Sequence, residues 1–499
     1  MSSEPGSGFA KPALGLIALA LVLVTAASIA DGSIGPVLVL ATAGVFLYFG
    51  TRRIAPRSEL GWVMSVAFGA FALRSAVAAL LVMRSLANGY GGFTTGDDIW
   101  YASAAGHVVE YLRGTPDTLF VPPYWNGEYY LMTTYVFVES AVFFVVGQHV
   151  LNMILVNSMI GAFTVVLVAD MGMRMFGRGA SIAVAAVLAV YPSVVVWSAV
   201  NLRDTMMILI VVATLWALLR MHERPSLSWI LVAFLGAWAA EGLRWYVEAV
   251  LLMVALLAVL VTFAVKGPAR RIRWPITAAA LFVLLLVHSG LAVYVTDPAI
   301  ALGSIGDVRA ANQFGRTAFD APPPAGTSSP GPSAIASASP TPSASSSTPA
   351  PVIAPTRVLR VDVDARTEYS RTLAHLPAGI MHTLFAPFPW AIQSAPELAA
   401  MPEMLLWYVI LGALLRTLWI QRRRWEWFLP EVLFLGALLL LLSLGEGNIG
   451  TLFRHRAMAV PAAILLAGPS LAVLGRRVLT VFGRAPLGSP NKERSLSAL

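Results

Sequence analysis

The chain has 499 residues, of which 58% are hydrophobic and only 12% charged, with a formal net charge of +8 at pH 7. Its mean hydropathy is +0.74, and apolar runs close to the length that an α-helix needs to cross a hydrocarbon core of about 30 Å recur along it. A soluble protein of this size would need more charge, a β-barrel would show short alternating segments, and the absence of cysteine excludes disulfides and thiolate metal sites.

The composition therefore predicts an all-α polytopic membrane protein, and the apolar runs give its candidate spans. They lie at residues 12–31, 34–50, 61–83, 131–147, 149–172, 180–199, 205–221, 226–242, 245–266, 274–296, 402–421, 427–445 and 457–475. The first run is followed by small residues at the spacing that a signal peptidase uses, but no basic residues precede it, and we expect an uncleaved span.

Sixteen of the 34 Lys and Arg residues form short clusters directly beside these runs, where the preference of positive charge for the cytoplasmic side explains them. The clusters are Arg52 and Arg53 with Arg57, Arg174 with Arg178, Arg220 with Arg224, residues 266–273, residues 422–424, and Arg476 with Arg477. No basic groove or motif is visible, so no nucleic-acid partner is expected. If every run crossed the membrane, two clusters would lie outside.

One run must therefore not cross, and the short run 131–147, which carries Glu139, is the weakest. We predict a juxtamembrane or re-entrant helix there. About twelve transmembrane helices then remain, with both termini in the cytoplasm, in a multi-pass protein of the plasma (inner) membrane.

This topology divides the chain into four parts. They are an N-terminal helical hairpin at 1–60, a transmembrane module at 61–296 with its first external loop at 84–148, an external loop at 297–401, and C-terminal transmembrane helices with a cytoplasmic tail at 402–499. Residues 321–355 are rich in Pro, Ser and Ala without charge or periodicity, which predicts a disordered tether. The aromatic, Pro-broken stretch 375–393 is expected to lie at the outer interface.

The polar residues on the predicted external side are the candidates for chemistry, because charges at a membrane edge are costly to place. They include Asp97, Asp98, Tyr101, His107, Glu110, Asn201, Arg203, Asp204, Glu241, Arg244, Glu446, Asn448, Arg454, His455 and Arg456. Two adjacent acids, Asp97 and Asp98, suit a general base beside a carboxylate that orients the nucleophile or holds a cation. The alternative is a solvated loop in which one of them caps the following helix.

Three external arginines, Arg244, Arg454 and Arg456, run against the positive-inside preference and need a counter-charge. A phosphate or pyrophosphate matches guanidinium forks, and pairing with nearby acids such as Asp204 is the alternative. The histidines His107 and His455 are expected to be hydrogen-bonding or interfacial residues rather than metal ligands, since neither lies in a ligand-spaced cluster.

Four stretches follow one another in a recognisable order: GDDIWYASAAGHVVEYLRG, VPPYWNGEYYLMTTYVFVESAVFFVVG, NMILVNSMIGAFTVVLVADMGMRMFGR and ASIAVAAVLAVYPSVVVWSAVNLRDTMMILIVV. Together they resemble the first external loop, the Pro-Pro segment with its helix, a small-residue span, and the second acidic motif of GT-C fold membrane glycosyltransferases. That group includes the protein O-mannosyltransferases and the lipid A aminoarabinose transferases. The resemblance runs over residues 61–222; it departs from the family where Asp98 replaces a common Glu and where the Pro-Pro segment lacks a preceding His.

The resemblance implies an inverting transfer of a sugar from a polyprenyl-phosphate or polyprenyl-diphosphate donor to an acceptor hydroxyl on the extracytoplasmic face, in cell-envelope glycan or glycoprotein synthesis. On matching positions, Asp97 takes the place of the catalytic base, Asp98 of its neighbouring acid, and Asp204 of the second acidic motif. The candidates for binding the substrate phosphate are Arg203, Arg244, Arg454 and Arg456, and further site candidates are Tyr101, His107, His455 and Glu446. Members of the family differ in metal use, so a divalent ion held by the three aspartates stays open.

Rival functions remain at this point. The stretches PFPW and EGNIGTLFRHR look like bacterial surface-polysaccharide ligases or polymerases that use lipid-linked oligosaccharide. A transporter or flippase for lipid-linked sugars would show internal repeats, and none is visible. In a scaffold without catalysis, the adjacent acids would be ordinary caps. The sequence carries no signal for oligomeric state.

Overall fold

The computed structural model describes residues 7–30, 32–115, 134–224, 226–266, 283, 365–392, 395–445 and 449–481, and the regular elements among them are all helical. In chain order they are α1 (Ser7–Ala30), α2 (Gly35–Ile54), α3 (Leu60–Ala87), α4 (Gly96–Leu112), α5 (Thr134–Val146), α6 (Val150–Phe176), α7 (Arg178–Val190), α8 (Pro192–Ser198), α9 (Asp204–Glu223), α10 (Leu227–Glu241), α11 (Trp245–Lys266), α15 (Ala365–Phe385), α16 (Ala395–Gln421), the 3₁₀ helix η2 (Arg422–Trp427), α17 (Leu429–Gly445), α18 (Ile449–Arg456) and α19 (Val460–Val481). The prediction of an all-α membrane protein is confirmed.

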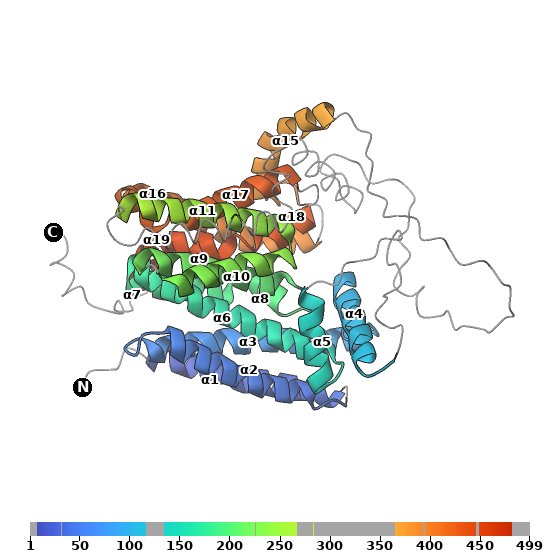
Figure 1. The fold of residues 1–499 in the computed structure, drawn as a ribbon. Coiled ribbons are helices and arrows are strands. Elements are labelled where there is room, and N and C mark those ends of the chain that lie inside the picture. The colour runs from blue at the N-terminus through green and yellow to red at the C-terminus, as the bar shows by residue number, and fades with distance from the viewer. Residues whose placement is uncertain are drawn as a thin grey trace, which may run out of the picture.

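The long helices pack side by side as one bundle (Figure 1). In the described part of the chain, six helices are long and apolar enough to cross a membrane, namely α1, α2, α3, α6, α9 and α16 with η2. Two bent pairs, α7 with α8 and α18 with α19, each qualify as one broken span. The span predicted at 274–296 and the tether predicted at 321–355 lie outside the described residues, except for residue 283, so the count of about twelve spans stays a prediction.

One end of the bundle carries the basic clusters that belong to the described residues, and we call it the basic end. There Arg174 pairs with Glu223 at 3.0 Å, and Arg178 pairs with Glu59 at 2.9 Å. The start of α1 and the end of α19 lie at this same end (Figure 1), which agrees with the prediction that both termini share one side of the membrane. We call the opposite end the distal end; α4, α5, α15 and α18 gather there (Figure 1).

Helix α5 lies across the distal end rather than through the bundle. Its first residue, Thr134, donates its backbone N–H to the carbonyl of Gly242, in the turn between α10 and α11, at 3.1 Å. The carbonyl of its last residue, Val146, packs against Gly35 at the start of α2, where an added Cβ would lie 2.8 Å away. Both neighbours lie at the distal end, so the structure agrees with the prediction that this run does not cross.

The run predicted as one span at 180–199 is instead two helices, α7 and α8, bent by 55°. Pro192 is the first residue of α8; it lacks an N–H and its ring crowds the preceding turn, which favours a break at this position. Two buried charges from other helices meet the helix ends that this break creates. Arg74 of α3 donates to the carbonyls of Ala189 at 2.8 Å and Leu188 at 3.3 Å, and Glu403 of α16 accepts from the backbone N–H of Ser193 at 2.7 Å.

A helix carries partial negative charge at its C-terminus and partial positive charge at its N-terminus. The cation at the C-terminus of α7 and the carboxylate at the N-terminus of α8 are therefore both stabilising. The side chain of Arg74 reaches the end of α7 by passing close to the backbone of Gly161 in α6. A Cβ at that position would lie 2.9 Å from the Nε of Arg74, so a larger residue would block its path. The break is therefore a stabilised feature. It carries the chain into the loop 199–203 and the start of α9, where part of the candidate site lies.

The stretch expected to be broken by proline at 375–393 begins inside a helix. α15 runs through Pro377, which removes one backbone hydrogen bond without ending the helix. Its last carbonyls are bound by α16, since Trp407 donates to Leu384 at 2.9 Å and Tyr408 donates to Phe385 at 2.7 Å.

Candidate active site

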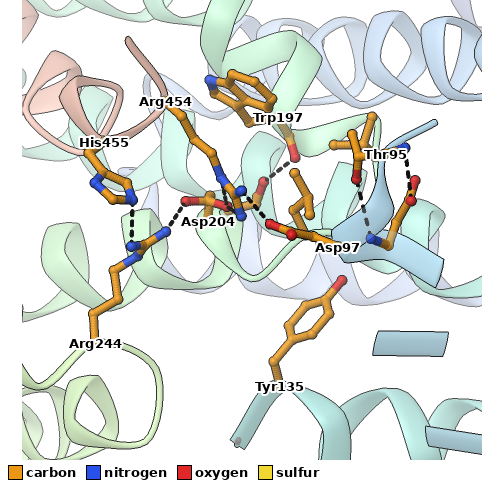
Figure 2. Close-up of polar contacts among 12 residues, drawn as sticks. Thr95, Asp97, Tyr135, Trp197, Asp204, Arg244, Arg454 and His455 are labelled. Atoms are coloured by element: carbon orange, nitrogen blue, oxygen red, sulfur yellow. Dashed lines mark hydrogen bonds and ion pairs between the residues drawn. The ribbon is translucent and has the colours of Figure 1, made fainter. Parts of the chain in front are cut away.

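Polar side chains from four separate elements meet at the distal end of the bundle (Figure 2). Asp97 comes from the first turn of α4, Asp204 is the first residue of α9, Arg244 lies in the turn before α11, and Arg454 comes from α18. The sequence predicted that these residues share one side of the membrane, and the structure brings them into one ion-pair cluster.

Asp204 lies at the centre of the cluster and is fully buried. Its Oδ1 accepts from Nη2 of Arg244 at 2.7 Å, and its Oδ2 accepts from Nε of Arg454 at 2.8 Å. The Nη2 of Arg454 also lies 2.6 Å from Oδ2. A buried carboxylate is stable only when it is paired and hydrogen-bonded, and two guanidinium groups meet that need. Asp204 therefore holds both arginines in place.

Arg454 joins this buried acid to an accessible one. Its Nη1 donates to Oδ2 of Asp97 at 2.6 Å, while the Asp97 side chain remains 57% exposed. Figure 2 shows the guanidinium between the two carboxylates. Of the acids in this cluster, Asp97 is thus the one that an incoming molecule can reach.

The neighbouring acid Asp98 has a different position and different partners. It is 1% exposed, and its carboxylate accepts from the backbone N–H of Thr94 at 2.7 Å, the hydroxyl of Thr94 at 2.8 Å and the backbone N–H of Thr95 at 2.9 Å. The backbone N–H of Asp98 donates to the hydroxyl of Thr95 at 3.2 Å, which completes a capping box. The alternative that the sequence left open, a helix cap, therefore describes Asp98. Successive helical residues point about 100° apart, so Asp97 faces the cluster instead.

Arg203 stands beside the cluster as an unpaired cation. Its guanidinium has no hydrogen bond or ion pair within the described residues, and its Nε is buried without a partner. Its charge acts on the hydroxyl of Tyr101, as do the charges of Asp204, Arg454 and Asp97. Burial raises the pKa of Tyr101, which packs edge-on against Tyr135 at 5.0 Å, so this phenol is neutral and can act as a hydrogen-bond donor.

Arg244 is held on its other side by two hydrogen-bonding groups. Its Nη1 donates to the hydroxyl of Tyr246 at 2.9 Å and lies 2.6 Å from Nε2 of His455. A guanidinium can only donate, so Nε2 of His455 accepts and the imidazole is neutral. Burial alone would lower the pKa of Arg244, but the charges of Tyr246 and Asp204 raise it above its ordinary value.

Two further candidates, Arg456 and His107, lie outside the ion-pair cluster. Arg456 is 3% exposed and donates to the carbonyls of Thr383 at 3.2 Å and Ala386 at 2.9 Å, so it anchors the end of α15 instead of joining the cluster. Two helical positions differ by about 200°, which turns Arg456 away from Arg454. His107 pairs with Glu110 on α4 at 3.7 Å. Glu446 lies outside the described residues.

The three aspartates do not form a metal site in this arrangement. No group of three His, Cys, Asp or Glu side chains placed to hold a metal occurs in the part of the chain that the structure describes. The carboxylate of Asp98 is occupied by its own turn, and a guanidinium fills the position between Asp97 and Asp204.

Sequence reasoning gave Glu139 no role and did not single out Tyr135 and Asn157, which form a buried network behind the cluster with Asn201. It also missed Arg74 and Glu403 at the helix break. What these residues share in the sequence is a polar side chain inside an apolar run. Burying such a side chain costs free energy, so its presence indicates a structural or functional role.

Comparisons with known proteins bear on the fold. A family model described as dolichyl-phosphate-mannose-protein mannosyltransferase matches residues 132–292. This stretch includes Asp204 and Arg244 but begins after Asp97, whose correspondence to that family rests on the resemblance alone. A search of curated proteins found no significant match.

A solved structure of the archaeal oligosaccharyltransferase AglB from Archaeoglobus fulgidus, in complex with an inhibitory peptide and a dolichol-phosphate, superposes with a TM-score of 0.50 at 14% identity. The match covers 86% of this chain and 53% of that one, so this chain spans about half the length of the solved protein. The fold expected from the sequence is confirmed: the chain has the GT-C fold of membrane glycosyltransferases.

Proposed function

We propose that the chain is a membrane glycosyltransferase that moves a sugar from a polyprenyl-phosphate or polyprenyl-diphosphate donor to an acceptor hydroxyl on the extracytoplasmic face, in cell-envelope glycan or glycoprotein synthesis. The observation that carries the proposal is the contact of Arg454 with both the exposed Asp97 and the buried Asp204 at the distal end of a GT-C bundle. The dolichol-phosphate in the AglB structure supports a lipid-linked donor.

Asp97 is the general base of the proposed reaction. Its exposed carboxylate takes the proton of the acceptor hydroxyl as the hydroxyl oxygen attacks the anomeric carbon of the donor sugar. The bond between that carbon and the phosphate oxygen breaks, and the departing lipid phosphate keeps the electron pair. A single displacement of this kind inverts the configuration of the sugar.

The arginines stabilise the charge that grows on the departing phosphate. Arg203 has a guanidinium with no partner among the described residues, so it binds phosphate without breaking an existing ion pair. Arg454 exchanges one anion for another: the donor phosphate replaces Asp97 as its partner, while Asp204, which is itself paired with Arg244, holds Arg454 from the buried side. Donor binding thereby frees the carboxylate of Asp97 to accept a proton.

A ligase or polymerase that transfers a lipid-linked oligosaccharide is the second candidate. It would use the same base and the same arginines, because the bond that breaks is chemically the same. The observation that favours it is the structural match to an oligosaccharyltransferase.

A donor panel tests the proposal. Purified protein in liposomes is incubated with radiolabelled polyprenyl-phosphate monosaccharides, polyprenyl-diphosphate monosaccharides and polyprenyl-diphosphate oligosaccharides, and released lipid phosphate is followed with and without a mixture of acceptor glycans. Release from a monosaccharide donor supports the first candidate, and release from oligosaccharide donors alone supports the second. Movement of labelled donor between leaflets without release would show a flippase and would contradict both.

A further inference from the structure

A buried polar network lies directly behind the ion-pair cluster. Its members are Tyr135 and Glu139 of α5, Asn157 of α6, and Asn201 of the loop before α9, and all four are fully buried. None of them belongs to the chemistry proposed above. Buried polar groups need complete hydrogen bonding, so the order of their contacts shows what the network holds in place.

The contacts form a chain with a fixed direction. Asn157 donates from Nδ2 to the hydroxyl of Tyr135 at 2.9 Å, and that hydroxyl donates to Oδ1 of Asn201 at 2.7 Å. The Nδ2 of Asn201 then donates to Oε1 of Glu139 at 2.6 Å. The Asn201 amide therefore accepts from Tyr135 through its oxygen and donates to Glu139 through its nitrogen, and these two contacts together hold it in one orientation.

Asn201 connects the elements that carry the two acids of the cluster. It lies three positions before Asp204, in a loop whose carbonyls at Val200 and Leu202 accept from Asn157 at 3.0 Å and 3.1 Å. Its Nδ2 also reaches the backbone carbonyl of Asp98 at 3.4 Å, beside Asp97. The same amide thus contacts the turn of α4 and belongs to the loop that leads into α9.

We propose that Glu139 is a positioning residue of the active site: it orients Asn201, and Asn201 holds the turn that carries Asp97 in register with Asp204. The proposal rests on the proposed function for its kinetic consequences. Its structural consequence, the order of the turn at residues 94–99, can be measured without any activity.

The charge state of Glu139 makes the proposal specific. The described residues give it no basic partner, its Oε2 has no hydrogen-bond partner, and the groups that face it are Asn201, Tyr135 on its own helix and the carboxylate of Asp98 on α4. Burial raises the pKa of Glu139 to about 8; the hydrogen bond from Asn201 lowers it, and the charge of Asp98 raises it. The acid is therefore neutral at pH 7 and ionises as the pH rises through about 8.

Ionised Glu139 would be a second buried negative charge beside Asp98, and the turn would move to separate the two. At alkaline pH, the turn that carries Asp97 is thus expected to lose its register with Asp204. The variant Glu139→Gln keeps a neutral side chain with an oxygen that can accept from Asn201, and it cannot ionise. It is the matched variant for every measurement below.

The first measurement is amide hydrogen exchange of residues 94–99 in the liposome-embedded protein, corrected for the intrinsic effect of pH. We expect protection in the wild type to fall by about tenfold as the pH passes through about 8, while Glu139→Gln stays protected. Asn201→Ala should lose the same protection at every pH. Equal pH dependence in the wild type and Glu139→Gln, or full protection in Asn201→Ala, would overturn the proposal.

The second measurement is the pH profile of lipid-phosphate release. Glu139→Gln should keep kcat within about twofold of the wild type at pH 7 and lack the alkaline decline of the wild type. Asn201→Ala should lower kcat by about tenfold or more with the donor KM little changed, because the base is misplaced while the phosphate contacts remain. An unchanged alkaline limb in Glu139→Gln would overturn the proposal, whereas a wild type that releases nothing overturns the proposed function and leaves hydrogen exchange to decide this inference.

Discussion

The guanidinium of Arg454 lies 2.6 Å from the carboxylate of Asp97, an acid from the opposite part of the chain. The same guanidinium lies 2.6 Å from Asp204, so one cation serves both carboxylates. In the resting protein, Asp97 is therefore an ion-pair partner as well as a candidate base. Asp97 can accept a proton once the donor phosphate has replaced it as the ion-pair partner of Arg454.

Activity is expected to survive removal of divalent metals. Arg454 already supplies positive charge between Asp97 and Asp204, where a metal would otherwise be needed. Lipid-phosphate release measured after exhaustive chelation should stay within about twofold of the untreated rate. A loss that added manganese or magnesium reverses would show that these acids rearrange to hold a metal.

Removing Arg203 should weaken donor binding without disturbing the fold. Its guanidinium has no partner in the described part of the chain, so Arg203→Ala breaks no ion pair. A lost contact between a guanidinium and a phosphate corresponds to about 1.5–3 kcal/mol, or roughly ten- to one-hundredfold in donor affinity. Arg84→Ala, which removes an exposed arginine from the distal end of α3, is the matched control. Equal donor affinity in the two variants would exclude Arg203 from the phosphate site.

Asp98 should matter for the start of α4 more than for the chemical step. Asp98→Ala removes the acceptor for three donors in residues 94 and 95, and losing a capping residue destabilises a helix by about 1 kcal/mol. Asp98→Asn keeps one acceptor oxygen and should retain more activity than Asp98→Ala. If both variants lose as much activity as Asp97→Asn while hydrogen exchange of α4 is unchanged, Asp98 has a chemical role that its contacts do not explain.

The α7–α8 break depends on Arg74, which gives a prediction about stability. Arg74→Leu leaves the carbonyls of Leu188 and Ala189 without their buried donor, and each unsatisfied group destabilises the fold by about 1–3 kcal/mol. A lower thermal unfolding midpoint in lipid nanodiscs is expected, with Arg74→Lys intermediate. Arg52→Leu, at the basic end of α2, is the control with no expected change. An unchanged midpoint for Arg74→Leu would mean that other groups stabilise the break.

Hydropathy was enough to predict the helical bundle, because spans are set by length and apolar content. The same signal could not locate the break at Pro192, since both of its helices are apolar. Arg74 and Glu403 come from helices far apart in the chain, and their meeting at this break depends on tertiary packing. The run at 131–147 was predicted not to cross because the positions of the basic clusters constrained it, and α5 lies across the distal end as that prediction requires (Figure 1).

The candidate site was predicted only in part, because the distribution of charge indicates which residues share a side of the membrane but not which side chains meet. Charge gathered on one side of the membrane placed Asp97, Asp204, Arg244 and Arg454 among fifteen polar residues predicted to share that side. The sequence could not show which of two adjacent acids would cap α4, because that depends on where the helix begins. The sequence also could not show that Arg454 joins the cluster while Arg456 does not. The two side chains point in different directions because they lie two positions apart on the short helix α18.

The most direct test of the account compares Asp97→Asn with Glu110→Gln, an exposed acid on the same helix that pairs with His107 outside the cluster. Lipid-phosphate release is measured in liposomes with the donor identified from the panel, together with donor binding. We expect Asp97→Asn to lower kcat by about 10²- to 10⁴-fold while donor binding is retained, and Glu110→Gln to stay within about twofold of the wild type. Release that is the same in the wild type and Asp97→Asn would contradict the assignment of Asp97 as the base and the mechanism built on it.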